Sequence, residues 1–170
     1  DSDEVRIAFR DEGFGDPVLL IHGFASNVIV NWANTGWIEA LKRADYRVIA
    51  MDVRGHGESD KLYAAEQYTP VHMVEDVRRL LDHLAINQAD IMGYSMGARI
   101  TAFFSLIYPE RIRSAILAGV GINLVNGMGA PEPIAAALEA DSLAEVTDTS
   151  ARAFRAFADQ TKSDRQALAA

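Results

Sequence analysis

Four short apolar runs, separated by segments of helical pattern, constrain the fold of this chain more than any other feature. The runs span residues 18–21, 47–51, 90–92 and 114–118. Each is apolar on both faces, which is expected for strands of a parallel sheet that helices cover on two sides. Strands alternating with helices at this spacing imply right-handed βαβ units. The sequence therefore predicts an α/β fold with a doubly wound, mostly parallel sheet.

The segments between the runs carry the helical pattern. Residues 70–86 are the clearest case, with Thr69 as a suitable N-cap and Pro70 at the first helical position. Their buried stripe repeats every three or four residues and consists of Val74, Val77, Leu81 and Leu84. A second helix is predicted to start near Gly36. A third, over residues 96–108, is apolar nearly all round, so we expect it to be deeply buried.

The two ends of the chain differ from this alternating middle. Residues 5–10 alternate between apolar and polar side chains, which predicts a half-buried edge strand. Residues 121–133 are rich in Gly, Asn and Pro and predict a loop. Two Ala-rich helical segments follow, over residues 133–140 and 150–170, and no further strand-like run comes after them.

Bulk properties exclude several classes of protein. An apolar fraction of 49% and a charged fraction of 24% are ordinary for a globular domain. No apolar run is long enough to span a membrane and no signal peptide is recognisable, so we expect a cytoplasmic protein without a membrane partner. A formal net charge of −8 argues against nucleic acid as a partner. Cysteine is absent, which rules out disulfides and thiolate metal sites.

A metal site or a cofactor is likewise not expected. His56, Glu58 and Asp60 are two residues apart on a loop, without a helical register or a third well-placed ligand. The glycine-containing loop around them lacks the Lys-Ser/Thr ending of a phosphate-binding P-loop. We therefore predict no bound metal and no cofactor.

The segment Gly93-Tyr94-Ser95-Met96-Gly97 follows one of the buried runs and opens an apolar helix. In this strand–turn–helix setting a serine stands clear of the sheet on a sharp, strained turn. Such a turn brings its flanking residues almost into contact, which requires small residues at Gly93 and Gly97. It also directs the free N–H groups of the helix N-terminus at the serine, where they favour a developing negative charge. We predict Ser95 to be a nucleophile, with a small residue at a βα turn as the alternative.

Three segments together resemble the α/β-hydrolase superfamily, in its branch with a serine nucleophile and a helical cap. They are residues 19–24 (Leu-Leu-Ile-His-Gly-Phe), residues 52–59 (Asp-Val-Arg-Gly-His-Gly-Glu-Ser) and the turn at Ser95. Their order and spacing match the family over about residues 5 to 120. The resemblance implies the α/β-hydrolase fold.

The resemblance also implies roles for individual residues. The backbone N–H groups of Phe24 and Met96 would form an oxyanion hole, and His22 would shape the turn instead of acting as the base. Asp52 and Arg54 would stabilise loops near the site. For the aromatic residues at the expected mouth, packing in the core is the alternative to lining a substrate pocket; these are Tyr94, Trp32 and Trp37.

The sequence departs from the family after Ser95. The family places its catalytic acid and histidine after the serine, but all four histidines of this chain precede it, and no acid follows a late strand. We therefore expect residues 1–121 to be the N-terminal part of the core and residues 122–170 the start of a cap, with the last strands absent. An exposed apolar sheet edge would then favour self-association and leave this chain inactive by itself.

These observations predict a serine hydrolase that acts by acyl transfer on a small ester, lactone or similar carbonyl substrate. The acid and histidine of the triad would lie outside this chain. A serine at position 95 disfavours the dehalogenase and epoxide hydrolase branches, whose members carry aspartate there. Carbon–carbon bond hydrolases, cofactor-free haloperoxidase-like members and a non-catalytic binding or receptor protein on the same scaffold are the alternatives.

Overall fold

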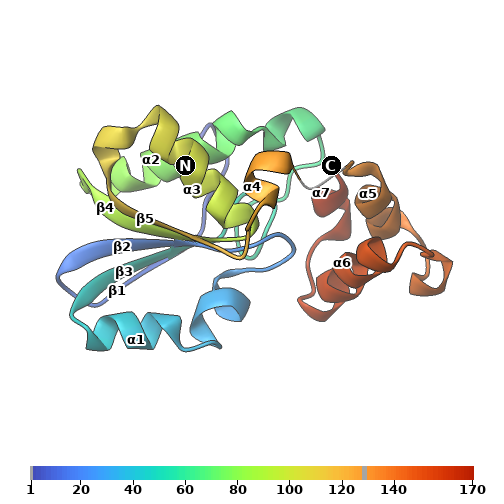
Figure 1. Ribbon diagram of the computed structural model, residues 1–170, viewed down its shortest axis with the longest axis horizontal. Helices are drawn as coiled ribbons and strands as arrows, with labels where there is room; N and C mark the ends of the chain where they lie inside the picture. The colour runs from blue at the N-terminus through green and yellow to red at the C-terminus, as the bar shows by residue number, and fades with distance from the viewer. Residues whose placement is uncertain (1, 128–129) are drawn as a thin grey trace.

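A computed structural model describes residues 2–127 and 130–170 and contains a five-stranded sheet in the order β1-β3-β2-β4-β5 (Figure 1). β2 pairs in parallel with β3 and β4, and β4 pairs in parallel with β5. Only β1 is antiparallel, to β3. The strands are β1 (Phe9–Glu12), β2 (Asp16–Ile21), β3 (Tyr46–Met51), β4 (Ala89–Tyr94) and β5 (Ile112–Ala118). The predicted mostly parallel sheet is confirmed.

Helices cover both faces of this sheet. α1 (Trp37–Arg43) lies below it in the view of Figure 1, while α2 (Pro70–His83) and α3 (Met96–Ile107) lie above it. Successive residues of β2 point to opposite faces, so Leu19 packs with the α2 and α3 side and Leu20 with the α1 side. Shorter helical turns span Ile29–Ala33, Ala65–Tyr68, Pro109–Arg111 and Leu143–Glu145. The doubly wound arrangement is confirmed.

The N-terminus of α2 forms as its sequence predicts. Thr69 is extended, and its side chain accepts a hydrogen bond from the His72 N–H, while Pro70 is the first helical residue. The helix buries Val74, Val77 and Leu81 of the predicted stripe, while Leu84 follows the helix as its C-cap and is half-buried. Asp76 is buried as well, and its carboxylate accepts two hydrogen bonds of 2.7 Å from the guanidinium of Arg54. The sequence pattern did not reveal this buried ion pair.

The first strand is not where the alternation predicted it. It begins at Phe9 and not at Val5, because the backbone before Phe9 bonds to the loop over residues 52–60. Ala8 accepts from the Asp52 N–H and donates to Ser59 Oγ, and Arg6 donates its N–H to Asp60. This segment therefore ties the loop to the core instead of pairing with a strand.

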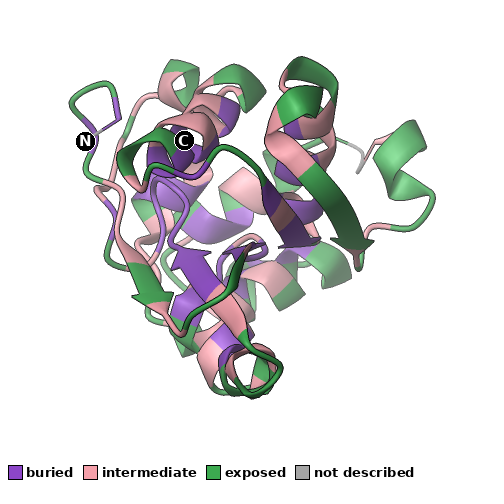
Figure 2. Cartoon of the chain, turned by 90° about the vertical axis from the view of Figure 1, so that its left-hand side faces the viewer, coloured by how far each residue is buried: buried purple, intermediate pink, exposed green. Residues whose placement is uncertain are grey.

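The expectation of a deeply buried α3 is wrong for one face of the helix. Its Phe104 is fully buried against the sheet and α2, but Leu106 is 78% exposed and Phe103 is 43% exposed. Neighbouring β5 lies at the edge of the sheet, and most of its residues are exposed (Figure 2). Within the described residues, nothing covers these two surfaces.

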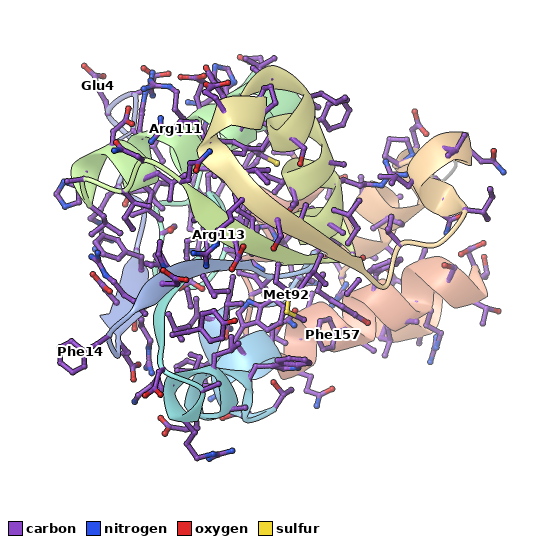
Figure 3. All side chains as sticks on the ribbon, turned by 60° about the vertical axis from the view of Figure 1, so that its left-hand side comes forward. Glu4, Phe14, Met92, Arg111, Arg113 and Phe157 are labelled. Carbon is purple, nitrogen blue, oxygen red and sulfur yellow. The ribbon has the colours of Figure 1, made fainter. Side chains whose placement is uncertain are left out.

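Ion pairs accompany the pairing of β5 with β4. Arg113, labelled in Figure 3, places its guanidinium nitrogens 2.6 Å from an oxygen of Asp16 and 2.5 Å from one of Asp90. Ser114 donates a hydrogen bond to Asp90 as well. Polar contacts thus link β5 to β4 and β2 at the surface, and Ile116 on the same strand is 51% exposed.

Three C-terminal helices lie beside the core, at the end of the sheet that leads into α3 (Figure 1). They are α5 (Glu132–Glu139), α6 (Thr149–Gln160) and α7 (Arg165–Ala169). The short α4 (Asn123–Asn126) precedes them, and its Asn123 carbonyl accepts a hydrogen bond from Arg99 of α3. Leu138, Ala158 and Leu168 from three of these helices pack around Ala25 of the core. The division of the chain near residue 121 stays a prediction. Among the described residues, no helix has the length and apolar character needed to cross a membrane.

The exposed surface of α3 and β5 generates the first prediction. We expect a solution of this 170-residue chain alone to self-associate, because contact between such surfaces removes apolar area from water. Leu106→Lys should weaken the association about tenfold or more, since burying a leucine side chain contributes about 1.5–3 kcal/mol. Sedimentation equilibrium measures the effect. The matched control is Val71→Lys at a 61% exposed position of α2, and equal effects of both variants would contradict the prediction.

Candidate active site

Ser95 stands on the sharp turn between β4 and α3. Its backbone has φ 53° and ψ −109°, a conformation that non-glycine residues rarely adopt, and its N–H donates to the Ala118 carbonyl at 2.8 Å. A Cβ at Gly93 would lie 2.2 Å from the Gly97 oxygen, and one at Gly97 would lie 2.1 Å from the Ile21 oxygen. Contact within the turn thus explains the predicted requirement for glycine at position 93, whereas the requirement at position 97 comes from the close approach of α3 to the end of β2.

The N-terminus of the helix that follows adjoins Ser95. Met96 is the first residue of α3, and the first N–H groups of a helix have no partner within it. Ser95 is partly exposed, and its Cβ would be 3.4 Å from a Cβ placed on Gly23. The loop after β2 therefore lies directly opposite the serine.

The buried side chain of His22 sets the orientation of that loop. Its Nδ1 lies 2.8 Å from the Gly23 oxygen and its Nε2 accepts from the Val53 N–H at 3.0 Å, so Nδ1 carries the proton. The Gly23 oxygen also accepts from the Ser26 N–H. In a trans peptide the C=O and the following N–H point in opposite directions. The Phe24 N–H is consequently directed away from these partners.

Burial lowers the pKa of His22 to about 4, so the ring is neutral near pH 7. Both ring nitrogens are engaged with the backbone, which leaves neither free to take a proton from Ser95. This geometry supports the predicted turn-shaping role of His22.

The loop over residues 52–59 is held by its own charged side chains. The Asp52 carboxylate accepts from the N–H groups of Val28 and Glu58, at 2.7 and 2.9 Å. Arg54 is 2% exposed and, besides its bonds to Asp76, donates to the Gln67 carbonyl. These contacts agree with the loop-stabilising roles that the resemblance implies for Asp52 and Arg54.

His56 lies in the same loop, with its ring 5.2 Å from that of His22 and 5.8 Å from that of Phe24. Burial, and secondly His22, lower the pKa of His56 to about 3. Its Nδ1 contacts the Arg54 carbonyl, and its buried Nε2 has no partner among the described residues. Asp60 pairs with Arg6 instead of approaching His56. Among the described residues, no group of His, Asp and Glu side chains converges as a metal site would require.

A cavity of about 280 Å³ opens where the C-terminal helices meet this site. Apolar side chains form most of its wall, and the rings of Phe24 and Phe154 meet edge to face at 5.8 Å. Arg99 is the only charged residue of the lining that the structure describes; its Nη2 donates to the Asn123 carbonyl, and its buried Nε has no partner there. The lining residues are Phe24, Met96, Arg99, Ala130, Pro131, Ile134, Ala135, Phe154, Leu168, Ala169 and Ala170.

The two aromatic residues predicted to line the pocket, Trp32 and Tyr94, differ in their surroundings. Trp32 is 1% exposed and packs in the core on the α1 side of the sheet, because the helical turn Ile29–Ala33 directs it inward. Trp32 is therefore a core residue, and the prediction that it lines the pocket is wrong. Tyr94 is 45% exposed and lies against Gly119 and Gly23, beside Ser95. Trp37 is 44% exposed at the start of α1.

Sequence reasoning missed Arg99, Asn31 and Thr161. Arg99 follows Ser95 by four residues, one helical turn, and this spacing was a signal that could have placed it near the serine. Asn31 accepts from the Gly23 N–H at 3.1 Å, and Thr161 donates to the Ala25 carbonyl at 2.8 Å. No local pattern marks these two contacts, because the partners come from separate elements.

The two buried histidines predict acid-sensitive stability. An unfolded histidine takes up a proton near pH 6.5, whereas His22 and His56 stay neutral in the fold down to about pH 4 and 3. Below pH 6.5 the unfolded chain therefore binds more protons, and stability falls as the pH falls through this window. Each histidine contributes at most about 1.4 kcal/mol per pH unit.

Urea unfolding at pH 7.0 and 5.0 measures this loss. His56→Phe should lose distinctly less stability between the two pH values than the unsubstituted chain. The exposed His83 is the control, and His83→Gln should show the full loss. The same loss in all three proteins would contradict the assignment.

Comparisons with known proteins agree with this geometry. The 2-hydroxymuconate semialdehyde hydrolase of Pseudomonas sp. (strain CF600) is 35% identical over 129 residues, 74% of this chain and 45% of that protein. Epoxide hydrolase 3 of Siraitia grosvenorii is 33% identical over 112 residues, 66% of this chain and 34% of that protein. This chain thus spans less than half the length of these relatives.

A solved structure of a hydrolase from Pseudomonas aeruginosa PA01 is 25% identical, with a TM-score of 0.74 over 99% of this chain and 68% of that chain. The family model of the alpha/beta hydrolase fold matches residues 16–165, which contain the sheet, the serine turn and most of the C-terminal helices. On this match, and on the strained serine between β4 and α3, the chain belongs to the α/β hydrolase fold family.

Proposed function

We propose that this chain carries the nucleophile and the oxyanion hole of a serine hydrolase. The observation that carries the proposal is the backbone of Ser95, held at φ 53° at the head of α3 and opposite the loop of Gly23 and Phe24. Backbone strain of this kind costs about 1–3 kcal/mol and persists where the surrounding structure enforces it. Such a turn exposes a hydroxyl to an incoming carbonyl carbon.

In the proposed reaction, Ser95 Oγ attacks the carbonyl carbon while a general base takes its proton. The negative charge on the carbonyl oxygen is stabilised by the N–H groups of Met96 and Phe24. Collapse of the intermediate expels the leaving group, which takes up the proton, and leaves an acyl group on Ser95. Water then releases the acid by the same steps.

The general base is proposed to come from outside these 170 residues. His22 and His56 are buried and neutral, and His72 bonds to Thr69 at the start of α2. His83, the last of the four, lies near the ring of Phe9 at the other end of that helix. No described histidine is therefore in a position to activate Ser95.

The cavity supports a small, partly apolar substrate that carries an anionic group. Its wall is apolar except for Arg99, whose guanidinium has a buried Nε without a partner among the described residues. A guanidinium matches the geometry of a carboxylate. One relative is a 2-hydroxymuconate semialdehyde hydrolase, and the compound in that name is a carboxylate. We therefore propose a carbonyl substrate with a carboxylate, bound by Arg99.

An active-site probe tests the nucleophile. A fluorophosphonate should label the gene product that contains this chain, and peptide mapping should locate the label at Ser95. Ser95→Ala should abolish labelling. Ser105→Ala, on the same helix and with its hydroxyl bonded to the Thr101 carbonyl, should retain it. A folded protein without labelling would favour a non-catalytic binding protein on the same scaffold.

A substitution of Arg99 tests the substrate class. Arg99→Met should raise KM for mono-p-nitrophenyl succinate about tenfold or more, since a hydrogen bond to a charged group contributes about 1.5–3 kcal/mol. KM for the neutral p-nitrophenyl acetate should change less than about twofold on the same argument. Arg99→Lys keeps the positive charge, so its KM for mono-p-nitrophenyl succinate should lie between those of the unsubstituted protein and Arg99→Met. Equal losses on both esters would show that Arg99 serves only the fold.

A further inference from the structure

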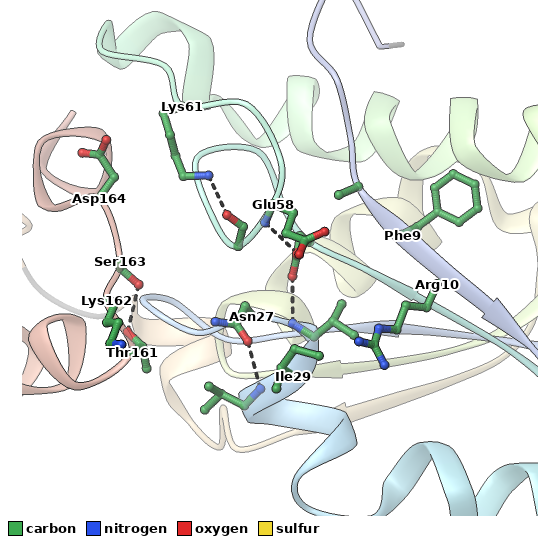
Figure 4. Close-up of a pocket in the computed structure, with 15 residues that line it drawn as sticks. Phe9, Arg10, Asn27, Ile29, Glu58, Lys61, Thr161, Lys162, Ser163 and Asp164 are labelled. Atoms are coloured by element: carbon green, nitrogen blue, oxygen red, sulfur yellow. Dashed lines mark hydrogen bonds between the residues drawn. The ribbon is translucent and has the colours of Figure 1, made fainter.

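The turn between α6 and α7 bonds directly to the loop that carries Phe24. Thr161 Oγ1 donates to the Ala25 carbonyl at 2.8 Å, and Ser163 Oγ lies 3.3 Å from the same oxygen. The partners Ala25 and Thr161 are 136 residues apart in the sequence. Figure 4 shows Thr161 and Ser163 with the 2.9 Å contact between their hydroxyls.

The backbone of Ala25 is strained, so its conformation depends on such a contact. It is fully buried and has φ 55°, the left-handed conformation that a type II turn requires at its third residue. A residue with a Cβ holds this conformation at a cost of about 1–3 kcal/mol, so it needs support from its surroundings. The Thr161 hydroxyl supplies part of this support, because it bonds the carbonyl that follows the strained dihedral.

The loop is thus held from two directions. On the core side, Asn31 Oδ1 accepts from the Gly23 N–H at 3.1 Å. On the other side, Thr161 bonds the Ala25 carbonyl. Phe24 lies between these two anchors, so the direction of its N–H depends on both of them.

The Thr161 hydroxyl also has a second acceptor. The carbonyl of Phe157, one turn earlier in α6, lies 3.0 Å from Oγ1. A hydroxyl has one proton to donate. If the C-terminal helices move away, Thr161 can donate this proton to the Phe157 carbonyl of its own helix. The Ala25 carbonyl would lose the hydroxyls of both Thr161 and Ser163 in that movement, and its strained turn would then be free to relax.

We propose that Thr161 is a positioning residue for the oxyanion hole, through which the seating of α5, α6 and α7 controls the orientation of the Phe24 N–H. This inference rests on the proposed function. The apolar contacts of Ala25 with Leu138, Ala158 and Leu168 support it, because they join the same loop to the same helices. Substrate that fills the cavity between these parts would stabilise the seated arrangement and complete the oxyanion hole.

The chain offers a matched control. Tyr63 donates its hydroxyl proton to Asp164 at 2.9 Å, so it also ties the core to this turn. This bond does not touch the loop over residues 22–26. Tyr63→Phe therefore removes one attachment of the turn and leaves the Ala25 carbonyl bonded.

The experiment compares Thr161→Val, Thr161→Ser and Tyr63→Phe in the gene product that contains this chain, with p-nitrophenyl acetate as substrate. Loss of an oxyanion donor costs about 100- to 1000-fold in kcat, so partial misplacement of one should cost about tenfold or more. Thr161→Val should show this fall in kcat with KM changed less than about twofold, because the donor acts in the transition state. Thr161→Ser should restore the rate, and Tyr63→Phe should match the unsubstituted protein.

Amide exchange gives a readout that does not depend on turnover. Deuterium uptake of a peptide covering residues 22–27 should be faster in Thr161→Val and unchanged in Tyr63→Phe. If Thr161→Val has the same kcat and the same deuterium uptake as the unsubstituted protein, the inference is overturned. If fluorophosphonate still labels Ser95 in that case, the proposed function stands. Equal losses in Thr161→Val and Tyr63→Phe would also overturn the inference, since the turn would then act only by general attachment. Absence of labelling in the unsubstituted protein would overturn both.

Discussion

The close approach of α3 to the end of β2 is the constraint on which the rest of this structure depends. Gly97 lies so near the Ile21 carbonyl that a Cβ there would be 2.1 Å from its oxygen. This contact lets the turn after β4 close, which holds Ser95 at a positive φ. It also brings the loop after β2 opposite the serine. Any side chain at position 97 would separate these two parts and disassemble the site.

Buried polar groups then orient what the close approach brings together. His22 bonds the Gly23 carbonyl on one side and the Val53 N–H on the other, so it joins the two loops that follow β2 and β3. Asp52 joins the second of these loops to the Val28 N–H. Because these groups are shielded from water, leaving one of them unpaired would cost about 1–3 kcal/mol. The loops around Ser95 are therefore held by contacts that do not take part in any reaction.

Local patterns predicted the elements well and the long-range contacts poorly. The cap at Thr69 and the strands β2 to β5 depend on residues within a few positions of one another, so the sequence displays their causes directly. The motif around Ser95 is equally local in the sequence, although the contact between Gly97 and Ile21 that closes its turn is not. The start of β1 was predicted too early, because its backbone is taken by a loop about fifty residues later. Trp32 was predicted to line a pocket, but it packs in the core because the helical turn that carries it faces the sheet.

The sequence by itself determined the order of strands and helices, the glycines at positions 93 and 97, and Ser95 as the predicted nucleophile, because each follows from spacing along the chain. Only the tertiary structure decided that Arg54 pairs with Asp76, that Arg99 borders an apolar cavity and that Thr161 bonds Ala25. Each of these depends on how separate elements pack in space, and hydrogen bonds between distant partners leave no periodic trace in a sequence.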